Sequence, residues 1–188
     1  MLLKNEKFQV KITEDETFTL ESTDNLPYDI FFNPENLDRS NITKALRIRI
    51  KSKDRERDVI LIGSFYCYDT DCAVLEDNKL AVLMNNTVTV IDLEECKISK
   101  HEKFSEFGCY FSICKFQGDY IIHGELEIVK LDKDLNKEWD FSGADIFVTQ
   151  DNNKPFQISG DKILLYDWNG AYYELDMNGK LIYDTYKK

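Results

Sequence analysis

The strongest constraint on the fold is an internal repeat in the chain. Three apolar segments mark it, at residues 78–83, 119–124 and 161–166. The spacing is 41 residues from Leu80 to Ile121 and 42 residues from Ile121 to Ile163. Further short apolar stretches lie before and after each marker, and alternation at period two is typical of strands. Four short strands recurring about every 40–45 residues predict three equivalent four-stranded units.

The remaining strands of each unit follow from the same pattern. Leading strands are expected at 72–75, 110–116 and 156–159. Second strands, each ending in an acidic turn, are expected after the markers at 87–92, 126–132 and 171–176, and the last ones around Ile98, Trp139 and 181–183. The pairs Asn85-Asn86 and Asn169-Gly170 separate two of these strand pairs. Because Asn and Gly tolerate positive φ best, they indicate tight hairpin turns.

The end of the last repeat carries a resemblance to known proteins. A strand closing with Leu175-Asp176 is followed by Asn178-Gly179-Lys180 and then by an apolar strand. In this order the sequence resembles the blades of the WD40 and quinoprotein-like β-propeller families, over roughly residues 66–185. The Gly-His and Trp-Asp pairs of a WD40 repeat are missing, and Asp167-Trp168 reverses the second pair. The resemblance therefore implies a fold and no functional residue.

Residues 1–66 do not follow the repeat, and we expect them to form an N-terminal β-subdomain beside a repeat region at 67–188. Alternation predicts strands around residues 8–12, 17–21, 46–51 and 59–65. A short helix is expected within 34–45, where Asn33 can cap it and Pro34 suits its first turn. Three blades cannot close a propeller, whose smallest ordinary form has about four. We therefore expect an all-β protein with an incomplete or open propeller, completed by residues 1–66 or by a second copy.

Charge excludes one class of function. The 188-residue chain has 35 Asp and Glu against 24 Lys and Arg, a net charge of -11, and its pI is about 4.7. A general nucleic-acid binder needs a net basic face, so none is expected. No apolar run approaches the roughly 18 residues of a membrane span, and no signal peptide is recognisable. With five cysteines, an odd number, these features favour reduced thiols in a cytoplasmic protein.

Four of the cysteines recur in step with the repeat, since Phe65–Cys72 matches Phe107–Cys114. The cysteines concerned are Cys67, Cys72, Cys109 and Cys114. One interpretation is a zinc site of four thiolates, which are the soft ligands that zinc prefers. The other is that cysteine, as a small apolar residue, fills equivalent core positions. The long spacing between the ligands and the alternation of strand side chains favour core positions, so no cofactor is expected.

The sequence assigns no catalytic residue. Its only histidines are His101 and His123. Because His123 stands within an apolar strand, we expect it to be a satisfied or pore-facing side chain. A Cys–His pair would need a third, orienting group, and none lies at a recognisable spacing.

Two groups of residues are candidates for contact with a partner. The first is the basic stretch 44–57, in which Arg47, Arg49 and Lys51 alternate along one strand. Such a face can grip a phosphate-bearing partner or the acidic half of another copy, although it is also a common way to protect an edge strand. The second is the set of aromatic residues in the last repeat, Tyr166, Trp168, Tyr172 and Tyr173. Tyr and Trp beside carboxylates can anchor a basic protein, and blade core is the alternative.

These features favour a non-enzymatic protein-binding module. An acidic immunity or inhibitor protein that masks a basic partner, such as a bacterial nuclease toxin, has this profile of size and charge. Two alternatives stay open. One is a small-molecule or zinc-binding protein, or an enzyme, whose site lies where the repeats converge. The other is a structural β-domain that associates with itself.

Overall fold

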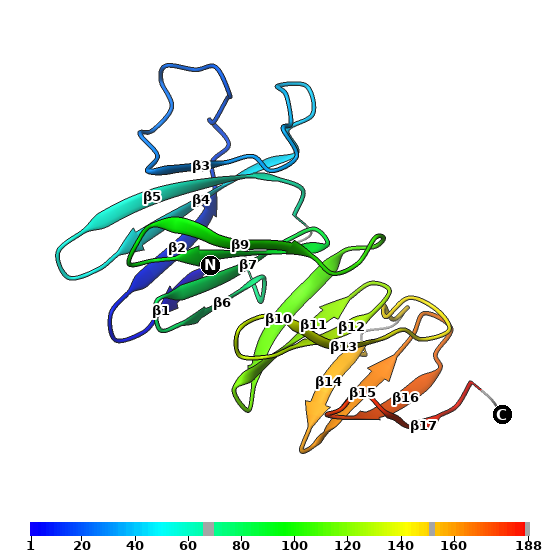
Figure 1. Ribbon diagram of the computed structural model, residues 1–188. Coiled ribbons are helices and arrows are strands. Elements are labelled where there is room, and N and C mark those ends of the chain that lie inside the picture. Colours follow the sequence, from blue (N-terminus) through cyan, green and yellow to red (C-terminus); the bar gives the residue numbers. More distant parts are fainter. Residues whose placement is uncertain (66–69, 151–152, 187–188) are drawn as a thin grey trace. The chain divides into compact units, whose positions relative to one another are not determined.

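A computed structural model describes residues 1–65, 70–150 and 153–186 (Figure 1). The protein is all-β, with four open sheets and no helix in the described part of the chain. It follows that none of these residues belongs to a helix able to cross a membrane. The chain divides into two compact units, Met1–Lys103 and Phe104–Lys188, which are taken separately below.

The three predicted repeats are three four-stranded antiparallel sheets, each with its strands in chain order. The first sheet contains β6 (Ala73–Glu76), β7 (Lys79–Met84), β8 (Thr87–Asp92) and β9 (Lys97–Lys103). The second contains β10 (Tyr110–Phe116), β11 (Asp119–Gly124), β12 (Ile128–Leu131) and β13 (Lys137–Phe141). The third contains β14 (Phe156–Ser159), β15 (Lys162–Tyr166), β16 (Tyr172–Asp176) and β17 (Leu181–Asp184). The prediction of propeller-like repeats is confirmed.

One local device recurs in all three sheets, at the turn before the last strand. Asp92, Asp132 and Asp176 begin these turns, and Oδ1 of each accepts two backbone N–H bonds of 2.8–2.9 Å. The register of each strand pair shifts one or two residues before the aspartate. A carboxylate that caps its own turn explains why an acidic residue recurs there in the sequence.

Residues 1–65 form the fourth sheet, which differs in topology and has five strands in the order β1-β2-β4-β5-β3. Its strands are β1 (Leu2–Lys4), β2 (Gln9–Glu14), β3 (Ile30–Phe32), β4 (Lys44–Lys51) and β5 (Glu56–Gly63), and β3 pairs with β5 in parallel. Ile12, Ile48 and Leu61 share one buried core with Leu80 and Ile91 of the first blade. The N-terminal sheet and that blade thus form one compact unit. The division expected at residue 66 falls in 66–69, outside the described residues, and stays a prediction.

Two expected N-terminal elements are wrong. No strand forms at 17–21, because Thr17 N–H and Oγ1 both donate to Asp15 and bend the chain. No helix forms within 34–45, because Asn33 closes a single turn by bonding both the N–H and the carbonyl of Leu37. Both segments nevertheless bury apolar side chains, since Phe18 and Leu37 cover the outer side of the N-terminal sheet.

Candidate functional site

The basic face predicted on β4 exists, but acidic side chains of the neighbouring strand β5 pair with it. Arg47 makes a bidentate contact with Asp58, with Nε–Oδ1 at 2.7 Å and Nη2–Oδ2 at 2.9 Å. Arg49 lies 3.3 Å from Glu56 and 3.6 Å from Asp58, and Lys51 lies 3.1 Å from Glu56. The hydrogen bonds from Arg47 hold the pKa of Asp58 below its ordinary value. The three predicted contact residues are therefore occupied within their own sheet.

The cysteines do not gather into a metal centre in the part of the chain that the structure describes, where no cluster of three or more potential ligands occurs. Cys72 lies in the core of the first unit, and Cys114 packs against the core of the second. Cys109 Sγ lies 3.9 Å from a carboxylate oxygen of Glu125. Burial and this carboxylate raise the pKa of the Cys109 thiol to about 11. Cys67, the fourth candidate ligand, lies outside the described residues.

The four aromatic candidates fall into three different environments. Tyr166 and Tyr172 are a cross-strand pair on β15 and β16, with ring centroids 5.0 Å apart, and Tyr183 extends the row. Tyr173 is buried, so its side chain belongs to the core rather than to a contact surface. Alternation along β16 explains the split, because neighbouring residues face opposite sides of a sheet. Trp168, in the β15–β16 turn, is 43% exposed.

A buried carboxylate holds the turn that presents Trp168. Asp167 is 1% exposed, and its Oδ1 accepts the N–H of Ala171 at 2.8 Å. Its Oδ2 accepts the hydroxyl of Tyr173 at 2.7 Å, and burial raises the pKa of this tyrosine to about 12. A further bond, from Trp168 N–H to the carbonyl of Ile146 at 2.8 Å, fixes the turn to the loop between β13 and β14.

The β11–β12 turn of the preceding blade is built in a similar way. Glu127 is 8% exposed and accepts the hydroxyl of Tyr110 at 3.1 Å. Leu126, next to it in this turn, is 38% exposed, and Phe107, in the connection between β9 and β10, is 76% exposed. Gly108 has a φ of 77°, and a Cβ there would lie 3.1 Å from Leu126 Cγ. A side chain at this position would be strained by the positive φ and would require Leu126 to move, so glycine is favoured here.

Backbone hydrogen bonds join these turns into one surface of the second unit. Glu125 N–H donates to the carbonyl of Cys109 at 2.8 Å, and Phe147 N–H donates to the carbonyl of Glu125 at 2.7 Å. The bond from Trp168 to Ile146 then continues the series to the next blade. We call this the acidic turn surface, which consists of the apolar residues Phe107, Leu126 and Trp168 and the acidic residues Glu106, Glu125 and Asp145.

His123 supports the same surface from beneath. Its Nε2 lies 3.0 Å from the carbonyl of Phe147, and because a carbonyl only accepts, this nitrogen carries the proton. The ring stacks on Phe156 at 5.2 Å and meets Phe111 edge-on at 5.1 Å. Burial lowers the pKa of His123 to about 4, so the side chain is neutral at physiological pH. Its role is to hold the loop between β13 and β14.

Of the acidic turn surface, only Trp168 was predicted from the sequence. Phe107 and Leu126 look like blade core in an apolar pattern, since their exposure depends on how the turns are folded. A signal was nevertheless present for the turn itself. In Asp167-Trp168-Asn169-Gly170 the aspartate precedes an Asn-Gly turn, which is a position where a carboxylate can cap the backbone.

Comparisons with known proteins add a likeness of fold alone. No known protein family matches the sequence, and neither does any curated protein. Solved structures similar to this chain include the computationally designed Ika8 protein, at 9% identity and a TM-score of 0.48 over 79% of this chain and 50% of that one. The AfRom2 CNH domain is 12% identical, with a TM-score of 0.45 over 77% of this chain and 47% of that one. BamB from Moraxella catarrhalis is 12% identical, with a TM-score of 0.47 over 75% of this chain and 45% of that one. The chain spans about half the length of each.

Proposed function

We propose that the protein is a non-enzymatic binding module that holds a basic protein partner against the acidic turn surface. The observation that carries this proposal is the exposure of Phe107, Leu126 and Trp168, of which Leu126 and Trp168 stand on turns beside the buried, hydrogen-bonded carboxylates Glu127 and Asp167. Large apolar side chains grouped on rigid turns are typical anchors of protein interfaces, because little conformational entropy is lost when they are covered.

The charge around these anchors indicates the kind of partner. Glu106 and Glu125 precede Phe107 and Leu126 in the chain, and Asp145, in the loop between β13 and β14, accepts a hydrogen bond from Asn169 beside Trp168. The net charge of the chain is -11. A carboxylate rim attracts a basic surface over several ångströms and repels an acidic one. An inhibitor or immunity-type protein that masks a basic enzyme is one form that this function can take. A cytoplasmic location remains a prediction from the odd number of cysteines.

Affinity capture from the cells that make the protein tests the proposal. We compare the wild-type chain with Phe107→Ala/Trp168→Ala and with the matched control Arg49→Ala/Lys51→Ala, whose side chains are exposed but lie in the other unit. A protein of high pI should be recovered with the wild type and the control and lost with the first variant. A neutral or acidic partner, or equal capture by all three chains, would contradict the proposal.

Self-association is a second candidate function, which the row formed by Tyr166, Tyr172 and Tyr183 supports. These rings lie on the outward side of the last sheet, with centroid separations of 5.0 and 6.2 Å. Light scattering would distinguish a monomer from a dimer. A mass of twice 22.1 kDa that falls to 22.1 kDa in Tyr183→Lys would support self-association, and a monomeric wild type at every concentration would contradict it.

A further inference from the structure

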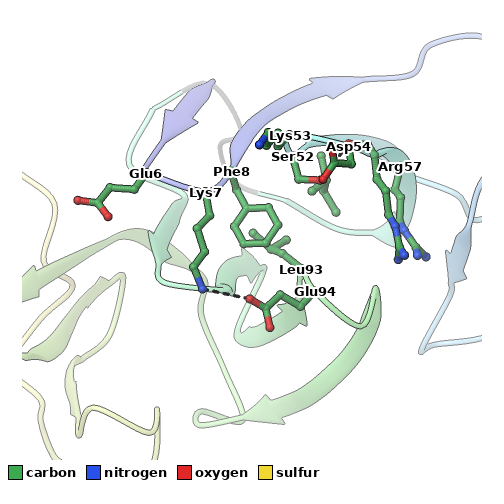
Figure 2. Close-up of a pocket in the computed structure, with 11 residues that line it drawn as sticks. Glu6, Lys7, Phe8, Ser52, Lys53, Asp54, Arg57, Leu93 and Glu94 are labelled. Atoms are coloured by element: carbon green, nitrogen blue, oxygen red, sulfur yellow. Dashed lines mark hydrogen bonds and ion pairs between the residues drawn. The ribbon is translucent and has the colours of Figure 1, made fainter.

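A cavity of about 410 Å³ lies in the first unit, where three hairpin turns converge (Figure 2). The β1–β2 turn contributes Lys7 and Phe8, the β4–β5 turn contributes residues 52–55, and the β8–β9 turn contributes Leu93 and Glu94. The volume is within the range of about 300–1,000 Å³ that is usual for small-molecule sites. The cavity is separate from the residues of the acidic turn surface.

Hydrogen bonds within each turn fix its backbone, so the cavity is preformed. Asn5 Oδ1 accepts two N–H bonds from its own turn, of 3.0 and 2.8 Å. Ser52 N–H donates to the carbonyl of Arg55 at 2.8 Å, and Asp92 Oδ1 accepts two N–H bonds of 2.9 Å. A ligand entering here would not have to order the turns first, which favours affinity.

The walls of the cavity combine an apolar floor with positive charge. Phe8 and Leu93 form the floor, and Figure 2 shows the Phe8 ring between Lys7 on one side and Arg57 on the other. Lys7 is paired with Glu94 at 3.2 Å. Lys53 and Arg55 differ from the paired cations of β4, because neither enters an ion pair within the described residues. The lining also includes the acidic residues Glu6, Asp54 and Glu94, so the four cations Lys7, Lys53, Arg55 and Arg57 exceed the acids of the cavity by one charge in an otherwise acidic protein.

We propose that this cavity binds a small organic anion, with its apolar part against Phe8 and Leu93 and its phosphate or carboxylate group at Lys53 and Arg55. The guanidinium of Arg55 supplies the planar fork of donors that matches such a group, and lysine adds a point charge. Residues 52–55 are the tip of the basic stretch 44–57, so this stretch divides into a self-paired strand and a turn that is available to a ligand.

Titration of the full chain with phenyl phosphate, benzoate, inorganic phosphate and phenol tests the proposal by calorimetry and by amide chemical shifts. An aromatic anion should bind at least about tenfold more tightly than inorganic phosphate or phenol. Its shifts should fall on residues 5–8, 52–55 and 93–95. Preference for phenyl phosphate or for benzoate identifies the anionic group. Lys53→Ala/Arg55→Ala should lose at least about tenfold in affinity, and Lys133→Ala, an exposed turn lysine of the other unit, should lose none.

The unfolding midpoint of each variant confirms that it is folded, which exposed turn positions should permit. The proposal is overturned if neither aromatic anion binds more tightly than inorganic phosphate. It is also overturned if Lys53→Ala/Arg55→Ala binds as the wild type does, or if the shifts fall on other turns. None of these outcomes bears on the acidic turn surface, so the two proposals are tested independently.

Discussion

The charged face of β4 and the acidic turn surface use charge in opposite ways. On β4, antiparallel register places Arg49 opposite Asp58 and Lys51 opposite Glu56, so each cation meets an acid of its own sheet. On the turns of the second unit, the buried carboxylates Glu127 and Asp167 accept tyrosine hydroxyls, and large apolar side chains such as Leu126 and Trp168 are exposed beside them. The charges of β4 are thus satisfied within their own sheet, whereas the exposed apolar side chains at these turns are available to a partner.

The largest effect that can sharpen this comparison is the response of the second unit to acid. Burial lowers the pKa of His123 from its ordinary 6.5 to about 4. The unfolded chain therefore takes up a proton between these values while the folded chain does not, and stability falls as pH falls from about 6.5 to 4. The loss should reach about 3 kcal/mol. Urea unfolding followed by tryptophan fluorescence measures it, since both tryptophans, Trp139 and Trp168, lie in this unit.

Two variants control for the other groups that titrate in this range. His123→Phe should be less stable at pH 7, because the carbonyl of Phe147 loses its donor, but its stability should change less with pH. The other histidine, His101, is more exposed, and His101→Asn should keep the wild-type dependence of the tryptophan signal. If His123→Phe retained the full dependence, the histidine would not be the cause.

The next largest effect is expected at Asp167, which holds the turn that carries Trp168. Asp167→Ala removes the acceptor of two buried donors, so the free energy of unfolding should fall by about 2–3 kcal/mol. Asp167→Asn keeps an acceptor oxygen in place, and its loss should be smaller, about 1 kcal/mol. The same fluorescence measurement compares the two. A loss under about 0.5 kcal/mol in Asp167→Ala would show that the turn does not depend on this carboxylate.

The smallest effects are expected on β4, where they should follow exposure. The Arg47–Asp58 side chains are only 20% and 19% exposed, so Arg47→Ala should cost about 1–2 kcal/mol. The Lys51–Glu56 side chains are 48% and 47% exposed, and Lys51→Ala should cost under about 0.5 kcal/mol. Far-UV circular dichroism during urea unfolding follows the sheets of both units, and comparison with the tryptophan fluorescence of the second unit isolates the change in this tryptophan-free unit. If Arg47→Ala and Lys51→Ala lowered the free energy of unfolding equally, the contribution of these ion pairs would not depend on their exposure.

The repeats could be predicted from the sequence because their determinants are local. Three signals act within a single hairpin: alternation at period two, Asn-Gly turns and capping aspartates such as Asp132. The blades form in the segments that carry these signals. The segment from Asp15 to Leu37 could not be predicted in the same way. Its apolar residues have strand-like and helix-like spacing, but side-chain hydrogen bonds of Asp15 and Asn33 bend the backbone. The apolar residues of these loops are nevertheless buried against the N-terminal sheet.

The candidate site was less predictable, because it depends on neighbours that sequence spacing does not reveal. The stretch 44–57 contains two acids and looks unbalanced, yet Asp58 follows it by one residue and neutralises Arg47 across the sheet. Tyr173 and Trp168 look alike as aromatics in an acidic repeat, but one is buried by strand alternation and the other is exposed by its turn.

The most direct test of the central claim is the affinity of the captured partner for Trp168→Ala, measured by calorimetry at two salt concentrations against the wild type and Lys51→Ala. If the acidic turn surface holds a basic protein, Trp168→Ala should weaken binding at least about tenfold and Lys51→Ala should leave it within about twofold. Added salt should weaken the wild-type complex. Binding that resists salt and depends on Lys51 rather than on Trp168 would contradict the account.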